Sequence, residues 1–224
     1  MKLDNRLSAV ASLVNKCDCF ADIGTDHAYL PMYLIGNNKA RRAVAADVRK
    51  GPLANARKTV SQYGLEDKIE LRLSDGLNSF KEGEVWEIAV CGMGGLLIAD
   101  FISRTVWLKS PETHFVLQPM THAEDLRKTL FDNGFYIDRE VAAADGDKLY
   151  IALSAYYSGM VREYSKADCV LGSLVNNSDE LSRRYIIKTA AAYEKKLAAL
   201  KAASKNTAEL EKLVSEINRY IDKA

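Results

Sequence analysis

Short apolar runs and amphipathic segments alternate over the first two thirds of the chain. Runs such as A-V-A-A at 43–46 are typical of strands that are buried on both faces of a parallel sheet. Segments with helical apolar periodicity predict helices between these runs. The expected strands span residues 18–23, 42–47, 69–73, 85–91 and 114–117, and the expected helices span 4–15, 28–37, 51–63, 95–104 and 122–132. This alternation predicts an α/β fold with helices on both faces of a parallel sheet.

The alternation ends in two strands with no helical segment between them. They span 135–143 and 148–157, and A-D-G-D-K at 144–148 is typical of a hairpin turn. A terminal hairpin inserts one antiparallel strand into the otherwise parallel sheet. A seven-stranded sheet of this kind resembles the Rossmann-like fold of class I methyltransferases, whereas a dinucleotide dehydrogenase would keep adding parallel strands.

From about residue 160 the pattern is helical only. A short helix is expected near 165–175. A long helix follows, with apolar residues at the intervals of a coiled coil: Ile186, Ala190, Tyr193, Leu197 and Leu200. Asn206 and Glu209 predict a capping box for a second long helix. Its apolar stripe is Leu210, Leu213, Val214, Ile217 and Ile221. We therefore expect an α/β domain over residues 1–158 and a helical coiled-coil hairpin over 159–224.

Composition and charge are those of an ordinary soluble protein, with 48% hydrophobic and 27% charged residues among 224. The net charge of +1 provides no overall attraction to nucleic acid or membrane. Residues 1–158 carry 19 Lys and Arg against 21 Asp and Glu, a net charge of −2, and residues 159–224 carry 12 against 9, a net charge of +3. No apolar run has membrane-spanning length, and the N-terminus lacks a signal-peptide core, so we expect a cytoplasmic protein without membrane contact.

Four scattered cysteines do not form the framework of a disulfide-rich protein in a chain of this length. Cys17 and Cys19 form a C-x-C pair without a second pair nearby, and the three histidines are dispersed. A zinc site would need ligands that this spacing does not provide. The cysteines are interpreted as small buried residues, and no metal is expected.

The most informative segment is A-D-I-G-T-D-H-A-Y-L-P at 21–31, which links the first strand to a helix. Gly24 allows a sharp turn and close approach of a ligand, as in nucleotide-cofactor loops. Asp26 replaces the second glycine of the dinucleotide fingerprint. Asp22 and Asp26 disfavour a pyrophosphate and accept a cation. S-adenosylmethionine carries positive charge on its sulfonium and amine, so it fits better than NAD; the alternative is a turn that binds no ligand.

Three later strands also end in residues suited to a ligand, because the carboxyl ends of parallel strands share one edge of the sheet. Asp47 can accept hydrogen bonds from both ribose hydroxyls. Asp75 can accept from an adenine amino group, beside the backbone of Gly76. G-M-G-G at 92–95 lets the backbone approach a substrate. The alternative for each is a solvated loop, a helix cap or a tight turn. Cys91 is disfavoured as a nucleophile because it lies inside an apolar strand.

Together these motifs resemble one family, the bacterial tRNA adenine-22 N1-methyltransferases. The motifs are D-I-G-T-D-H-A-Y-L-P at 22–31, A-A-D at 45–47, S-D-G-L at 74–77, G-M-G-G at 92–95 and L-Q-P-M at 117–120. R-L-x-x-V-A at 6–11 and the helical hairpin extend the resemblance over nearly the whole chain, and Cys91 departs from the small aliphatic residue expected there. The resemblance implies S-adenosylmethionine as methyl donor and N1 of an adenine in the D-arm of tRNA as acceptor. The cofactor-binding residues assigned on this basis are Asp22, Gly24, Thr25, His27, Asp47, Val48, Asp75, Gly76, Gly92 and Met93.

We assign the contacts with the reacting adenine to three residues, Asp26, His27 and Tyr29. N1 has a free lone pair, so no base is needed, but the methylated ring becomes cationic. We expect Asp26 to stabilise that charge, and His27 and Tyr29 to orient cofactor or base. The alternative is that Asp26 caps the following helix.

We assign tRNA binding to basic residues that cluster on the first long helix of the C-terminal region: Arg183, Arg184, Lys188, Lys195 and Lys196. The alternative for this cluster is a solvated helix face. Two other functions stay open from sequence, a nicotinamide-dependent oxidoreductase and a methyltransferase-fold RNA-binding protein without activity. The sequence leaves the oligomeric state and the set of tRNA substrates open.

Overall fold

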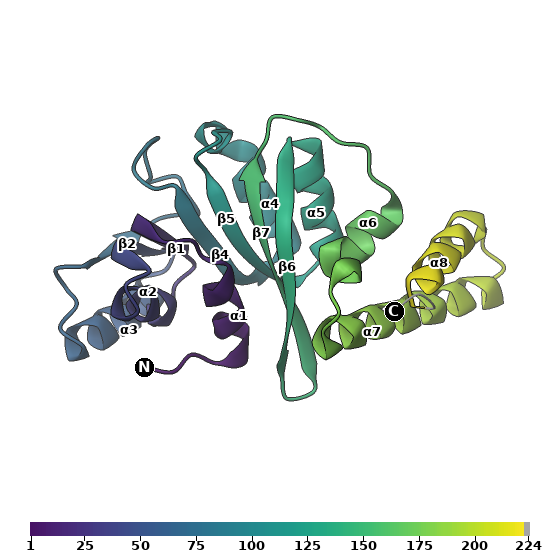
Figure 1. Cartoon of the computed structure of the whole chain (residues 1–224), viewed down its shortest axis with the longest axis horizontal. Coiled ribbons are helices and arrows are strands. Elements are labelled where there is room, and N and C mark those ends of the chain that lie inside the picture. The colour runs from purple at the N-terminus through teal and green to yellow at the C-terminus, as the bar shows by residue number, and fades with distance from the viewer. Residues whose placement is uncertain (222–224) are drawn as a thin grey trace.

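Seven strands form one sheet in the order β3-β2-β1-β4-β5-β7-β6 (Figure 1). The computed structural model describes residues 1–221. The parallel strands are β1 (Cys17–Ile23), β2 (Ala40–Asp47), β3 (Ile69–Leu73), β4 (Glu87–Gly94) and β5 (His114–Thr121). The hairpin strands are β6 (Phe135–Asp145) and β7 (Lys148–Tyr157). β7 is antiparallel to both β5 and β6, which confirms the predicted sheet with one antiparallel strand.

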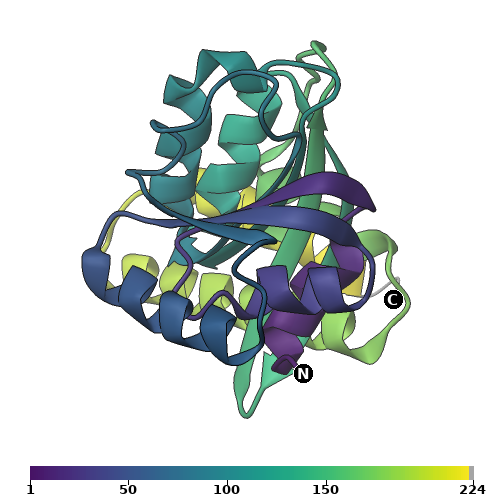
Figure 2. The ribbon, with the colours of Figure 1, turned by 90° about the vertical axis from the view of Figure 1, so that its left-hand side faces the viewer.

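Alternating side chains of the strands enter two hydrophobic layers, one on each face of the sheet. Phe20 and Ala45 pack with α1 (Asn5–Leu13), α2 (Tyr29–Gly36) and α3 (Lys50–Gln62). Ala21 and Val44 pack on the opposite face with α4 (Gly95–Arg104), the short 3-10 helix η1 (Val106–Leu108) and α5 (Ala123–Asp132). Figure 2 shows the sheet between these helix layers. The buried side chains of β2 are small, namely Ala43, Val44, Ala45 and Ala46, as expected for a strand covered on both faces.

Helix α1 lies against the hairpin and the end of β5. Asp4 caps its first turn by accepting from the Leu7 N–H at 2.6 Å. Lys39 caps its last turn, with Nζ donating to two backbone carbonyls, each at 2.8 Å. Asn5 donates to the Ala144 carbonyl at 2.9 Å, near the hairpin turn. These contacts hold the first turn of α1 at the carboxyl edge of the sheet, where β5 and β6 both end.

The C-terminal region consists of α6 (Lys166–Leu171), η2 (Gly172–Asn176), α7 (Glu180–Ala202) and α8 (Ala208–Ile221). The last two helices form the predicted antiparallel hairpin (Figure 1). Near its turn Lys201 pairs with Glu211 at 2.8 Å, and farther along Asn218 donates to Glu194 at 3.0 Å. That the two helices supercoil stays a prediction. We refer to residues 166–221 as the tail.

The predicted capping box of α8 is not formed. Asn206 accepts from the Ala208 N–H at 3.1 Å, but Glu209 reaches across to Lys166 at 2.6 Å instead of returning to the helix start. This contact joins α8 to the start of α6, so a tertiary ion pair replaces the local hydrogen bond.

The tail shares its hydrophobic core with the sheet. Buried residues of all its helices belong to the cluster that also contains α4, α5 and one face of the strands; among them are Ala167, Leu171, Leu174, Ile186, Ala190, Leu213 and Ile217. Residues 158–165 carry no helix or strand. The tail is packed against α5 and the hairpin strands β6 and β7. The division into domains over 1–158 and 159–224 stays a prediction.

Candidate active site

The turn after β1 is built by its backbone. Gly24 has a φ of +84°, and the N–H groups of Gly24 and Thr25 donate to the Ala46 carbonyl at 2.7 and 3.0 Å. The buried Thr25 hydroxyl accepts from the Ala28 N–H at 3.1 Å, at the start of α2. Thr25, and not Asp26, therefore holds the start of this helix. The alternative that Asp26 is a helix cap is wrong, and its side chain is available for another role.

A cavity of about 350 Å³ opens at this turn. Seven of the residues assigned from sequence line it: Asp22, Gly24, Thr25, Asp26, His27, Tyr29 and Gly92. Six further residues complete the lining: Asp4, Arg6, Leu7, Ala28, Leu30 and Cys91. The loops after β1 and β4 and the first turn of α1 thus meet at the carboxyl edge of the sheet, at the point where strand order reverses, which is where ligands bind in open α/β sheets.

Asp22 is the buried charge of this cavity, with 7% of its surface exposed. Burial raises the pKa of its carboxyl group to about 6, while a hydrogen bond from Thr25 and the positive charge of Arg6 lower it, and the Asp47 carboxylate raises it. A cation bound beside Asp22 would replace the water that the carboxylate lost on folding. The cavity therefore favours a ligand with a positively charged group.

Arg6 and Gln118 belong to the site although the sequence did not assign them. Arg6 Nη1 donates to Gln118 Oε1 at 2.8 Å, and the Gly92 N–H donates to the same oxygen at 3.1 Å. Gln118 is fully buried and its amide nitrogen donates to the Pro119 carbonyl at 3.0 Å. Three segments far apart in sequence are thus joined. The available signal was a polar residue, Gln118, at the end of an apolar strand.

The rim of the cavity carries the three residues assigned to the reacting base. Asp26 is exposed; its carboxylate accepts from Asn55 Nδ2 at 3.2 Å and lies 3.5 Å from His27 Nε2. The rings of His27 and Tyr29 are stacked, with centroids 5.0 Å apart and planes 8° apart. Both rings line the opening, so the rim offers a carboxylate and two aromatic surfaces to an incoming planar group.

Asp47 ends β2 and Val48 follows it, and neither residue lines the cavity. Asp47 is buried, and one of its oxygens accepts from the Arg49 N–H at 2.7 Å, with Arg49 Nε 3.6 Å away. The second oxygen has no protein partner among residues 1–221 at hydrogen-bonding distance. Val48 is 59% exposed. Asp47 is therefore fixed by its own loop with acceptor capacity left for a ligand.

Asp75, which the sequence assigns to adenine, pairs here with a basic residue of the neighbouring helix, and its contact with adenine stays a prediction. It forms a two-pronged ion pair with Arg104 of α4 at 3.2 and 3.3 Å and accepts from Asn78 at 3.4 Å. Gly76 has a φ of +57° and lies so close to Phe101 that a Cβ would be 2.8 Å from its ring. Neither residue lines the cavity, so the structure brings Asp75 to α4 and not to Asp22.

Met93 connects the loops after β1 and β4. Its methyl group would lie 2.1 Å from a Cβ at position 24, so the side chain rests on Gly24. Cys91, just before this loop, has a thiol whose pKa is raised by burial and by the neighbouring Asp22 carboxylate. A cysteine nucleophile is therefore disfavoured here, because only the thiolate attacks.

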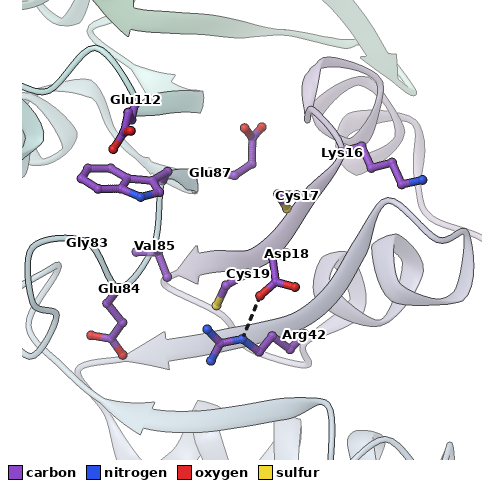
Figure 3. Close-up of a pocket in the computed structure, with 11 residues that line it drawn as sticks. Lys16, Cys17, Asp18, Cys19, Arg42, Gly83, Glu84, Val85, Glu87 and Glu112 are labelled. Carbon is purple, nitrogen blue, oxygen red and sulfur yellow. Dashed lines mark hydrogen bonds and ion pairs between the residues drawn. The ribbon is translucent and has the colours of Figure 1, made fainter.

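A second cavity of about 350 Å³ lies at the opposite, amino edge of the sheet (Figure 3). Asp18 and Arg42 pair across it at 3.5 Å, and Glu84, Glu87 and Glu112 make its lining acidic. Buried Glu87 is already satisfied, because it accepts from the Asn15 N–H at 2.7 Å and contacts His114 Nδ1 at 2.8 Å. This edge lacks the strand-end loops of an α/β ligand site.

The cysteines behave as structural residues. Burial raises the pKa of Cys17 to about 12, and burial likewise raises the pKa of Cys19 and Cys169. Within residues 1–221 one group of possible metal ligands lies close together, formed by His122, Glu124 and Asp125. His122 Nδ1 and Asp125 are 3.1 Å apart at the surface, which accounts for that proximity without an ion. In the same range no helix has the length and apolarity needed to cross a membrane.

The five basic residues assigned to tRNA all lie on α7 with exposed side chains. The buried face of that helix is formed by Ser182, Ile186 and Ala190 instead. None of the five forms an ion pair with another residue in 1–221, and Lys196 lies 5.8 Å from the Tyr193 ring. Their positive charges therefore face solvent.

A family model described as a methyltransferase domain matches residues 3–153. The tRNA (adenine(22)-N(1))-methyltransferase of Bacillus subtilis is 35% identical over 175 residues, which cover 78% of this chain and 74% of that protein. The chain belongs to the bacterial tRNA adenine-22 N1-methyltransferase family. This confirms the resemblance stated from the sequence motifs.

Solved structures related to this methyltransferase family match the tail as well. TrmK of M. capricolum, in complex with S-adenosylhomocysteine, is 28% identical with a TM-score of 0.81, covering 99% of each chain. A Streptococcus pneumoniae protein in complex with S-adenosyl-L-methionine is 30% identical with a TM-score of 0.85, covering 98% of this chain and 100% of the other. The arrangement of sheet and tail is therefore shared along the whole chain.

Proposed function

We propose that this protein transfers a methyl group from S-adenosylmethionine to N1 of adenine 22 in the D-arm of tRNA. The observation that supports this most directly is the cavity at the carboxyl edge, where one buried carboxylate faces one guanidinium in a chain of this methyltransferase family. A nicotinamide-dependent oxidoreductase is disfavoured, because Asp26 occupies the second glycine position of the dinucleotide fingerprint and the sheet ends in a hairpin.

The donors and acceptors of the cavity fit this cofactor. Its methionine end carries an ammonium and a carboxylate, which match Asp22 and Arg6 respectively. Asp47 is a buried strand-end carboxylate with a free oxygen, suited to two ribose hydroxyls. The cofactor supplies a methyl group activated by the positive sulfonium. Asp75, to which we assign the adenine contact, is engaged by Arg104 in this structure.

The rim residues act on the acceptor base. N1 of adenine attacks with its lone pair, so the site must position the base and compensate the positive charge that forms on it. Asp26 provides that negative charge, and the stacked His27 and Tyr29 rings provide a surface for the base. Because N1 lies on the Watson–Crick edge, the adenine must be unpaired or flipped to reach them. The exposed charges of α7 hold the RNA, and we place the enzyme in the cytoplasm, with its tRNA.

The decisive experiment is nucleoside mass spectrometry on unmodified tRNA incubated with the protein and S-adenosylmethionine. One methyl group at N1 of adenine 22, absent when that adenine is replaced by guanine, supports the proposal. An RNA-binding protein without activity would bind the same tRNA and leave its nucleosides unchanged. A product methylated at another position would contradict the assignment of the acceptor.

Asp47→Ala is expected to weaken binding of S-adenosylhomocysteine by about 1.5 to 3 kcal/mol, the range for a hydrogen bond to a charged group. Asp75→Ala is expected to weaken it less, because that carboxylate is occupied by Arg104. Isothermal titration calorimetry on the two matched variants measures both effects. Equal losses would show that Asp75 reorients to meet the cofactor, and unchanged affinity in Asp47→Ala would remove the ribose assignment.

Asp26→Asn is expected to lower the single-turnover rate at least about tenfold, with cofactor and tRNA affinities nearly unchanged. Asparagine preserves the side-chain shape, and Thr25 holds the helix start, so folding is maintained while the negative charge is lost. Rapid-quench measurement with saturating enzyme separates this rate from binding. Asn55→Ala, which removes a partner of Asp26 without removing the charge, is the control and should retain most of the rate. A wild-type rate in Asp26→Asn would show that the charge of Asp26 does not contribute to catalysis.

A further inference from the structure

A fully buried ion pair lies between the sheet and the tail. Arg127 of α5 and Glu140 of β6 are both 0% exposed, with Nε–Oε1 at 2.8 Å and Nη2–Oε2 at 3.1 Å. The remaining guanidinium nitrogen, Nη1, donates to the carbonyls of Cys169 and Val170 at 2.8 and 3.0 Å. These carbonyls belong to the last turn of α6, so Arg127 fastens the start of the tail to the body of the protein.

Glu140 points inward because β6 is irregular. The strand alternates buried and exposed residues until Asp138 and Arg139, which are both exposed, and its register against β7 shifts between Ile137 and Arg139. This β-bulge reverses the alternation, so Glu140 faces the core. Without it, Glu140 would point to solvent with Tyr136 and Asp138.

Gly172 and Asn177 complete the junction. Gly172 has a φ of +63°, and a Cβ there would lie 2.1 Å from Glu140 Oε2 and 2.5 Å from Arg127 Nε, so the chain turns directly on the ion pair. Asn177 donates to the Glu140 carbonyl at 2.9 Å and to Ser182 Oγ, in the first turn of α7, at 3.1 Å. We call Arg127, Glu140, Gly172, Asn177 and Ser182 the tail lock.

Stability alone does not account for this arrangement. Desolvation offsets most of the attraction in a buried ion pair, and apolar residues of similar volume are often as stabilising. Many of the other contacts of the tail with the body are apolar, made by residues such as Leu171, Leu174 and Ile186, and such contacts are not directional. Hydrogen bonds to two carbonyls and a bidentate carboxylate, in contrast, fix one orientation.

We propose that the tail lock is a positioning device, which sets α7 and its basic face at a fixed place relative to the catalytic cavity. This inference rests on the proposed function, with α7 as the surface that holds tRNA. A rigid tail then holds the bound tRNA at a fixed position, so that the target adenine reaches the catalytic cavity. Arg127 and Glu140 act as positioning residues, because they do not touch the reacting groups.

The test is the full-length double variant Arg127→Met with Glu140→Leu, which leaves no unpaired buried charge. Its urea midpoint should stay close to that of the wild type, and its affinity for S-adenosylhomocysteine should be unchanged, because neither residue lines the cavity. Its kcat/KM for tRNA should fall about tenfold or more, mostly through KM, since small misplacements of a substrate have effects of this size. Amide hydrogen exchange should accelerate in α6 and the first turn of α7 but not in β1 or β4.

The matched control makes the same kinds of substitution at an exposed pair, Arg41→Met with Asp18→Leu, at the amino edge of the sheet. It should retain wild-type kcat/KM. Asn177→Ala, which leaves the ion pair intact, should raise KM for tRNA in the same direction but less. If the double variant unfolds with cofactor present, the pair serves stability and the inference is overturned; it is equally overturned if both tail-lock variants fold and retain wild-type kcat/KM. Absence of methylation by the wild type would instead contradict the proposed function.

Discussion

Asp22→Asn is expected to stabilise the protein at pH 8 while abolishing most of its affinity for the cofactor. The pKa of Asp22 is raised from 3.8 to about 6 by burial. Between these values the folded protein holds a proton that the unfolded chain releases, so stability falls as pH rises toward 6. Above pH 6 the ionised carboxylate lowers the free energy of unfolding by about 3 kcal/mol, and asparagine removes that penalty.

Urea denaturation at two pH values measures this effect. The gain in unfolding free energy should be about 2 to 3 kcal/mol at pH 8 and should nearly vanish at pH 4, where the wild-type carboxyl is protonated. Asp26→Asn is the matched control, because it makes the same chemical change at an exposed carboxylate of the same loop. It should shift stability little at either pH. A gain that is equal at both pH values would not come from ionisation of Asp22.

Cofactor binding should respond in the opposite direction. The ionised Asp22 carboxylate is the partner of the cofactor ammonium, so Asp22→Asn should weaken S-adenosylhomocysteine binding by about 1.5 to 3 kcal/mol at pH 8. For the wild type, affinity should rise as pH increases through about 6 and then level off. Asp22 thus lowers the stability of the fold and raises the affinity for the ligand, which is a common trade-off between stability and function. Unchanged affinity in Asp22→Asn would show that Asp22 does not contact the ligand.

Neutralising the basic face of α7 is expected to remove tRNA binding without affecting the cofactor. The variant carries glutamine at five positions: Arg183, Arg184, Lys188, Lys195 and Lys196. Glutamine preserves helix propensity, and all five side chains are exposed, so α7 should form normally. With the duplex-DNA value of about 0.9 per phosphate contact, the loss of all five contacts should reduce the magnitude of the slope of log affinity against log salt by roughly 4.5.

A charge-matched control distinguishes a specific surface from general electrostatics. Five exposed basic residues near the amino edge of the sheet receive the same substitution: Lys16, Arg41, Lys68, Lys81 and Lys109. Both variants have equal net charge, but only the α7 variant should lose tRNA in filter-binding titrations across a salt series. Equal losses would mean that net charge matters and α7 does not. Deleting the tail is a poorer test, because its apolar residues complete the core of the sheet.

The local patterns along the chain were sufficient for the architecture. The helix at 95–104 and the strand at 69–73 have the predicted bounds, because each is bracketed by loop residues and has one clear periodicity. β5 continues to Thr121, past the predicted end at 117 and through Pro119, where its pairing with β4 is irregular. Proline is tolerated at such irregular positions, so its presence did not end the strand.

The chemistry of the site was only partly predictable. Glycines and aspartates next to strand ends could be placed because topology alone brings those ends together. Arg6 and Gln118 could not, since their contact joins residues 112 positions apart and depends on how α1 packs. The inward turn of Glu140 was equally hidden, because a one-residue bulge reverses the alternation that sequence reasoning assumes. The ion pair of Asp75 with Arg104 is likewise not visible in the sequence, because it joins residues 29 positions apart.

The buried position of Arg127 also constrains how the protein is made. The ribosome releases α5 and β6 well before Cys169 and Val170, whose carbonyls satisfy the Arg127 guanidinium. Until α6 and η2 emerge, the nascent body has an incompletely paired cation and an open apolar face where Leu171 and Leu174 will pack. The body therefore reaches its final packing only after synthesis has passed into the tail, and an interrupted chain leaves this part of its hydrophobic core exposed.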